Sequence, residues 1–171
     1  MAVTAQALVV EERVGVLAPL GFQAGAVAAC VRGDGDAARL DLALLRSEPP
    51  ATAAGVFTRN AVKAAPVVIS ELTLRRGTPV SAVVVNAGNA NACTGAQGLR
   101  DALRMCGIAA ESLGLEPSEV LVCSTGVIGR PLPLDRISSG IRSAAALDDP
   151  TGALLARAIM TTDTVPKIST V

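Results

Sequence analysis

Two short polar segments, each directly after an apolar run, hold the groups of this chain best suited to stabilise negative charge. Residues 86–95 read N-A-G-N-A-N-A-C-T-G, and residues 124–129 read S-T-G-V-I-G. A buried strand that ends in small residues exposes backbone N–H groups and hydroxyls at one sheet edge, and such groups build sites for a developing oxyanion. The Thr125 hydroxyl and the Gly126 N–H are the candidate donors, because glycine permits a close backbone approach. A tight turn is the alternative interpretation of both segments.

The chain contains no histidine, which limits the catalytic machinery it can hold. A Ser-His or Cys-His pair, and any zinc site with imidazole ligands, are excluded within these residues. Cys93 is the one thiol inside a glycine-bearing turn, and no histidine is available to activate it. Ser124 likewise has no neighbouring base. The sequence therefore favours a donor site over a nucleophilic serine or cysteine, and it predicts no metal site.

A third polar cluster, residues 161–164, ends a predicted helix. Its three threonines and one aspartate stand beside an otherwise apolar helix. Such a cluster commonly satisfies terminal carbonyls, and it can equally contact a polar substrate. Both interpretations of Thr161 and its neighbours stay open on the residues alone.

The elements that would position these segments alternate between strands and helices. The run at residues 80–85 has no polar alternation, which is typical of a central strand buried on both faces. Strands are predicted at residues 24–31, 40–45, 53–58, 67–69, 80–85 and 120–123, and another is predicted to open at 168–171. Short strands followed by strand–helix alternation indicate a layered α/β or α+β domain.

Helical periodicity is clearest after residue 94. Thr94 and Gln97 have the spacing of a capping box, and Gly114 suits the C-terminal cap. The apolar face is predicted to comprise Leu99, Ala102, Leu103, Cys106, Ala109, Ala110 and Leu113, opposite Arg100, Asp101, Arg104 and Glu111. A second helix is predicted after the two prolines at 131 and 133, and a third with Asp149 as its N-cap.

Composition limits the class of protein and its partners. The 171 residues, half of them apolar, suit one domain or one part of a larger one, and no apolar run approaches the ~18 residues that a membrane span needs. The formal net charge is zero without a long basic run, so neither nucleic acid nor a membrane surface is an expected partner. The four cysteines form no C-x-x-C pair, and residues 11–13 are charged rather than signal-like. Reduced, mostly buried thiols and a cytoplasmic location are predicted.

Four motifs occur together and in order over most of the chain. They are A-G-V-F-T-R-N at 54–60 with K-A-A-P-V at 63–67, N-A-G-N-A-N-A-C-T-G at 86–95, C-S-T-G-V-I-G at 123–129, and A-I-M-T-T-D-T-V-P-K at 158–167. Together they resemble the ornithine acetyltransferase family, also called glutamate N-acetyltransferases. The resemblance implies a layered α/β fold with two sheets between helix layers.

The resemblance also implies an arginine-biosynthesis enzyme whose precursor cleaves itself before a threonine. That new N-terminal threonine takes acetyl from N-acetylornithine and passes it to glutamate, and its own amine serves as base, which fits the missing histidine. Matched by position, Thr125 and Gly126 form the oxyanion hole and Thr161 contacts substrate. No cofactor is implied, although some members use acetyl-CoA as acetyl donor. No role is implied for Arg59, Asn89 or Asn91.

The chain departs from the family pattern at its end. The cleavage segment, K-G-x-G-M followed by P-N-M-A-T, is not found in these residues, and neither is the nucleophilic threonine. Residues 1–171 are therefore expected to be most of the α half, inactive without a β chain and assembled as α2β2. The alternatives are a related self-cleaving aminopeptidase, a secondary-metabolite acetyltransferase, and a non-catalytic α-like fragment that only binds a partner.

Overall fold

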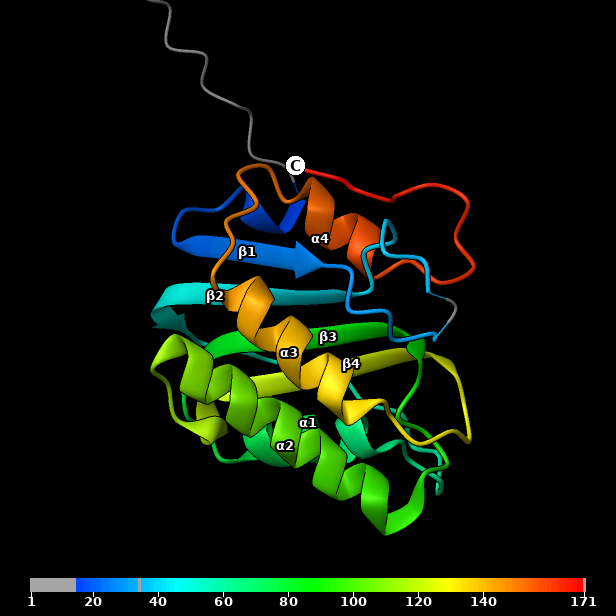
Figure 1. Ribbon diagram of the computed structural model, residues 1–171. Helices are drawn as coiled ribbons and strands as arrows, with labels where there is room; N and C mark the ends of the chain where they lie inside the picture. The colour runs from blue at the N-terminus through cyan, green and yellow to red at the C-terminus, as the bar shows by residue number, and fades with distance from the viewer. Residues whose placement is uncertain (1–14, 34, 171) are drawn as a thin grey trace, which may run out of the picture.

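The computed structural model describes residues 15–33 and 35–170, and these build one sheet with helices packed on it (Figure 1). The elements are, in chain order, η1 (Gly15–Leu17), β1 (Phe22–Val27), β2 (Leu42–Ala51), α1 (Ala65–Arg75), β3 (Val80–Asn89), α2 (Gly95–Leu113), η2 (Pro117–Glu119), β4 (Val120–Val127), α3 (Leu134–Ala145) and α4 (Ala153–Ala158). The charged segment at 11–13 and the last residue of the strand predicted at 168–171 lie outside the described residues.

The four strands pair in the order β1-β2-β3-β4. The first two pairings are antiparallel, and β3 runs parallel to β4, to which α2 connects it. The run that begins at Val80 is an inner strand, as its sequence predicted. The resemblance implied two sheets. The described residues form only one, because all four of their strands pair within the same sheet.

The two faces of the sheet are covered unequally. One face carries Leu42, Leu44 and Val84, which pack with α2 and α3 into the larger core. The other face carries Ala24 and Ala43 near β1 and β2, where α4 and η1 cover them in a smaller core. Figure 1 shows α3 lying across the strands and α4 beside β1. Small side chains allow these close contacts. A core with almost no aromatic residues must be built from many contacts between small apolar side chains.

On the second face, β3 and β4 remain half open. The strand register places Val83 beside Leu121 and Val85 beside Cys123, on the same face as Ala43. The two valines and Leu121 are only half-buried, and Cys123 is exposed. We call this surface, formed by Val83, Val85, Leu121 and Cys123, the open face. Sequence analysis predicted that the strand at residues 80–85 would be buried on this face as well as on the other.

The buried face of α2 differs from the predicted one. Leu99 and Leu103 are 39% and 55% exposed, whereas Asp101 is 4% exposed and Met105 is fully buried. The helix is therefore rotated, because Met105 and the alanines fill the core while Asp101 accepts a 2.6 Å hydrogen bond from the Gln97 side chain. Gln97 consequently does not complete a capping box. The expected left-handed cap at residue 114 is present.

Three predicted strands are wrong. Residues 53–58 are irregular and residues 67–69 lie inside α1, whose first turn contains Pro66. Proline is favoured at that position, and the helix overrides the strand preference of the following valines and isoleucine. Residues 168–170 are also irregular. None of the described helices is long and apolar enough to cross a membrane.

Asp149 organises the start of α4, although Gly152 rather than Asp149 is the N-cap residue. Its carboxylate is 1% exposed and accepts backbone N–H bonds from Gly152, Leu154 and Leu155 at 3.0, 2.9 and 3.1 Å. Its own N–H donates to the Ala24 carbonyl at 2.6 Å, which ties the turn to β1. A carboxylate at this place also complements the helix dipole.

Asp149→Ala is expected to lower the free energy of unfolding by about 3 kcal/mol, because several buried donors lose one charged acceptor. Denaturant unfolding measures the loss. Asp149→Asn keeps one acceptor oxygen and should recover part of it. The neighbouring exposed Asp148 provides the matched control, and Asp148→Ala should leave stability nearly unchanged. Equal effects at both positions would contradict the capping role.

Candidate functional site

The two polar segments found in the sequence meet at one edge of the sheet. In the parallel β3–β4 pair, Ala87 lies opposite Thr125 and Gly88 opposite Gly126. Parallel strands end at the same edge, which is where α/β sheets commonly bind ligands. The alternative of two unrelated tight turns is therefore not what the fold forms.

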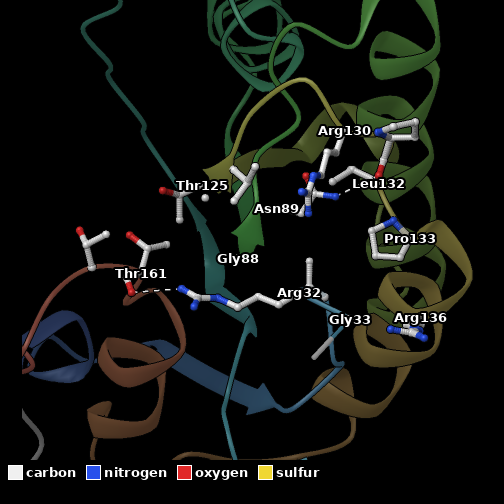
Figure 2. A pocket seen from close by; sticks show the side chains of 15 residues that line it. Arg32, Gly33, Gly88, Asn89, Thr125, Arg130, Leu132, Pro133, Arg136 and Thr161 are labelled. Atoms are coloured by element: carbon white, nitrogen blue, oxygen red, sulfur yellow. Dashed lines mark hydrogen bonds between the residues drawn. The ribbon is translucent and has the colours of Figure 1, made fainter. Parts of the chain in front are cut away.

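A cleft of about 800 Å³ opens at this edge and brings together residues from distant parts of the chain (Figure 2). Thr125, Gly126 and Thr161 all line it. Thr161 follows α4, and the strand β4 carries the other two. The structure thus brings the three predicted site residues together in one cavity.

The backbone N–H of Gly126 faces the free edge of β4. Val127 accepts a ladder bond from the Ala90 N–H, so odd-numbered residues of β4 direct their backbone groups toward β3. Four residues before Gly126, the Val122 N–H and carbonyl instead meet the Ser70 hydroxyl of α1 at 3.1 and 2.9 Å. Backbone groups alternate in direction along a strand. Gly126 therefore shares the outward direction of Val122.

The Thr125 side chain lies on the open face. Its partner Ala87 continues the row of Val83 and Val85, so Thr125 continues the row of Leu121 and Cys123. Thr125 is half-buried, and the described residues offer its hydroxyl no hydrogen bond. A donor without a protein partner at a cleft wall is free to meet a ligand oxygen.

Close backbone packing supports this arrangement. Gly126 has a φ of +128°, and a Cβ there would lie 2.5 Å from the Gly88 carbonyl oxygen and 2.6 Å from the Asn89 nitrogen. Both the dihedral angle and the missing space require glycine. The β3 and β4 backbones consequently approach closely where the candidate oxyanion donors stand.

The two asparagines without a predicted role differ in what they do. Asn89 lines the cleft, is 8% exposed, and donates to the Pro131 carbonyl at 2.9 Å. Its side-chain oxygen is buried and has no hydrogen-bond partner among the described residues. Asn91 instead serves the fold, since it donates to the Gly98 carbonyl at 2.8 Å and accepts from the Thr94 hydroxyl at 2.6 Å.

The third residue without a predicted role, Arg59, is exposed and does not line the cleft. Sequence analysis missed three other arginines that do, namely Arg32, Arg130 and Arg136. None of the described residues that line this cleft is acidic. The glycines at 33 and 129 are turn signals beside Arg32 and Arg130, which lie in the loops that follow β1 and β4. The cleft is therefore positively charged and suits a ligand with an anionic group.

The cysteines contribute nothing to this cleft. All four are free, and only Cys106 is buried, so the prediction of mostly buried thiols is wrong. Burial raises the pKa of the Cys106 thiol to about 12, which keeps it protonated and unreactive near neutral pH. Cys93 is exposed outside the cleft. Among the described residues, no group of three or more Cys, Asp or Glu side chains is placed to hold a metal ion.

Residues 23–171 match the model of the ArgJ family. The arginine biosynthesis bifunctional protein ArgJ of Symbiobacterium thermophilum is 56% identical over 154 residues, which are 90% of this chain and 38% of that protein. The protein of the same name from Geobacter sulfurreducens is 52% identical over 86% of this chain and 37% of its own length. The chain thus spans little more than a third of the curated relatives that it matches.

Two solved structures share the fold. The ornithine acetyltransferase from Mycobacterium tuberculosis, complexed with ornithine, superimposes with a TM-score of 0.83 at 43% identity, covering 89% of this chain and 81% of that one. Bacillus halodurans ArgJ gives 0.81 at 38% identity, covering 88% and 78%. The sequence resemblance is confirmed by the family match, the curated relatives and the shared fold: this chain belongs to the ArgJ family.

Proposed function

We propose that this chain is the N-terminal, α portion of an N-acetyltransferase that moves acetyl from N-acetylornithine to glutamate. The observation that carries the proposal is that Thr125, Gly126 and Thr161 line the same cleft, where the described residues offer the Thr125 hydroxyl no hydrogen bond. The names of the relatives support an arginine-biosynthesis role. Ornithine bound to the Mycobacterium tuberculosis enzyme supports the substrate class.

In the proposed reaction, a threonine hydroxyl from the second part of the enzyme attacks the acetyl carbonyl carbon of N-acetylornithine. The carbonyl oxygen becomes an oxyanion, which the Thr125 hydroxyl and the Gly126 N–H stabilise by hydrogen bonds. Collapse of this intermediate breaks the C–N bond, and the departing amine takes the proton that came from the threonine hydroxyl. Ornithine then leaves, and the acetyl group remains on the threonine as an acyl-threonine. The glutamate amine then attacks the acyl carbonyl carbon and forms a second oxyanion at the same donors. Its collapse breaks the ester C–O bond, the threonine oxygen takes up the proton that the amine loses, and N-acetylglutamate leaves.

The second part of the enzyme is proposed to cover the open face. That face presents half-buried valines over β3 and β4, beside Thr125. The relatives support a two-chain enzyme, because a similar length of match covers 38% of a curated relative and 81% of the chain in a solved structure. We infer that a second sheet from a β chain packs there, that α and β assemble further as α2β2, and that the enzyme acts in the cytoplasm without a cofactor.

The test compares this chain with a protein completed by the second half of a family member. Incubation with N-acetylornithine and isotopically labelled glutamate should give labelled N-acetylglutamate only with the completed protein, because the nucleophile is supplied there. A normal rate from the 171 residues alone would refute the proposal. Hydrolysis of peptide amides without acetyl transfer would instead identify an aminopeptidase, and acetyl-CoA in place of N-acetylornithine tests bifunctional use.

A further inference from the structure

Two arginines meet at the backbone of Thr161. The Arg32 guanidinium donates from Nη2 to the Thr161 carbonyl at 3.1 Å, and Arg39 donates from Nη2 to the same oxygen at 3.2 Å. Figure 2 shows the Arg32 side chain reaching across the cleft to this carbonyl. Both arginines come from the connection between β1 and β2, more than a hundred residues before Thr161.

The Arg32 side chain lies where β3 has no side chain. Gly88 has a φ of +103°, and a Cβ at this position would clash with Cγ of Arg32. Gly88 is also the strand partner of Gly126. The arginine stem therefore rests on the residue that packs against the oxyanion donors, while its guanidinium holds Thr161.

The start of the Arg32 side chain is itself fixed. The Asp41 carboxylate, 3% exposed, accepts the Ala29 N–H at 2.7 Å and the Val31 N–H at 2.6 Å. These charge-assisted bonds hold the loop immediately before Arg32. By contrast, residues 160–170, which include Thr161, form no helix or strand. The position of Thr161 therefore depends on side-chain contacts such as those from the two arginines.

We propose that Arg32 and Arg39 are positioning residues that fix Thr161 relative to Thr125 and Gly126. Two cationic donors on one carbonyl oxygen stabilise a single placement of an otherwise irregular segment, because each bond has a charged partner. The structural part of this inference stands on the described contacts alone. Its kinetic consequence rests on the proposed function, in which Thr161 contacts the substrate.

Hydrogen–deuterium exchange tests the structural part in the chain as it stands. Arg32→Met and Arg39→Met should each accelerate exchange of backbone amides at residues 159–165, and Arg32→Lys should do so less. Gly88→Ala should also accelerate this exchange, because the added methyl displaces the arginine stem, and it adds the strain of a side chain at a φ of +103°. Arg142→Met is the matched control, since Arg142 is an exposed arginine on α3 outside this cleft. Unchanged exchange in both Met variants, with native unfolding temperatures, would overturn the inference.

Steady-state kinetics of the completed enzyme test the consequence. Arg32→Met should raise KM for N-acetylornithine about tenfold, the effect of one charge-assisted hydrogen bond, with kcat within about twofold. Combined with Thr161→Ala, Arg32→Met should add little to the rise in KM, because both changes remove the proposed contact between the Thr161 side chain and the substrate. Full additivity, or a fall in kcat at constant KM, would contradict positioning through Thr161. A parent protein without acetyl transfer would refute the proposed function, and the exchange data would then decide this inference alone.

Discussion

Thr125→Ala is expected to lower kcat for acetyl transfer by the completed enzyme by about 10²- to 10³-fold, the usual cost of one oxyanion donor. The Thr125 hydroxyl stands at the cleft wall on the open face, and the described residues offer it no hydrogen bond. The hydroxyl is therefore free to donate a hydrogen bond to the oxyanion that forms in the transition state. KM should change little, since the ground-state carbonyl needs the donor less than the oxyanion does.

The control for this prediction is Thr125→Ser, which retains the hydroxyl and should keep kcat within about tenfold of the parent. Both variants should unfold at the parent temperature, because Thr125 is half-buried and outside both apolar cores. An Ala variant with nearly full kcat would show that another group supplies the second donor. A large loss in the Ser variant as well would indicate that packing by the methyl group, rather than hydrogen bonding, is what matters.

The location of the candidate donors could be predicted because it depends on local patterns. An apolar run that breaks into small polar residues marks a strand end, and two such runs joined by a helix are typical of a parallel pair. In the structure the two runs form a parallel pair, with Thr125 opposite Ala87 and Gly126 opposite Gly88, but β4 extends to Val127, so both residues lie inside the strand rather than after its predicted end at residue 123. Residue identity and short-range order were sufficient for this part of the site.

The arginines of the cleft could not be predicted from such patterns. Arg32 and Arg39 reach the Thr161 carbonyl over 129 and 122 residues of sequence. Contacts at that separation depend on how β1, β2 and α4 pack, and a solvated surface arginine has the same local sequence. Likewise, the rotation of α2 that buries Asp101 and exposes Leu103 depends on its neighbours, because alanines leave the apolar face broad.

At the open face, the burial predicted from the strand's sequence differs from the burial that the structure shows. The uninterrupted apolar run of β3 predicted burial on both faces, yet Val83 and Val85 are half-buried here, while Val84 between them is fully buried. This half-exposure supports the proposal that the second part of the enzyme covers the open face. In the proposed two-chain enzyme, a cover over these valines would lie beside Thr125, which continues the row of Leu121 and Cys123 on the same face.

The second large effect is expected from Gly126→Ala, which should lower the free energy of unfolding by at least about 3 kcal/mol and abolish acetyl transfer. The added Cβ would stand 2.5 Å from the Gly88 carbonyl oxygen and 2.6 Å from the Asn89 nitrogen. Both are backbone atoms of an inner strand, so no side chain can move aside to relieve the contact. The φ of +128° is a further cost for any residue with a side chain.

Gly129→Ala separates these two costs. Gly129 also has a positive φ, +75°, but a Cβ there meets no atom within 4 Å. It should therefore show only the dihedral penalty of about 1 kcal/mol, measured by denaturant unfolding of each variant. Equal destabilisation at 126 and 129 would show that the strand pair can separate without cost. If Gly126→Ala is the more damaging by the expected margin, the close approach of β3 and β4 is what holds the Gly126 N–H in position for an oxyanion.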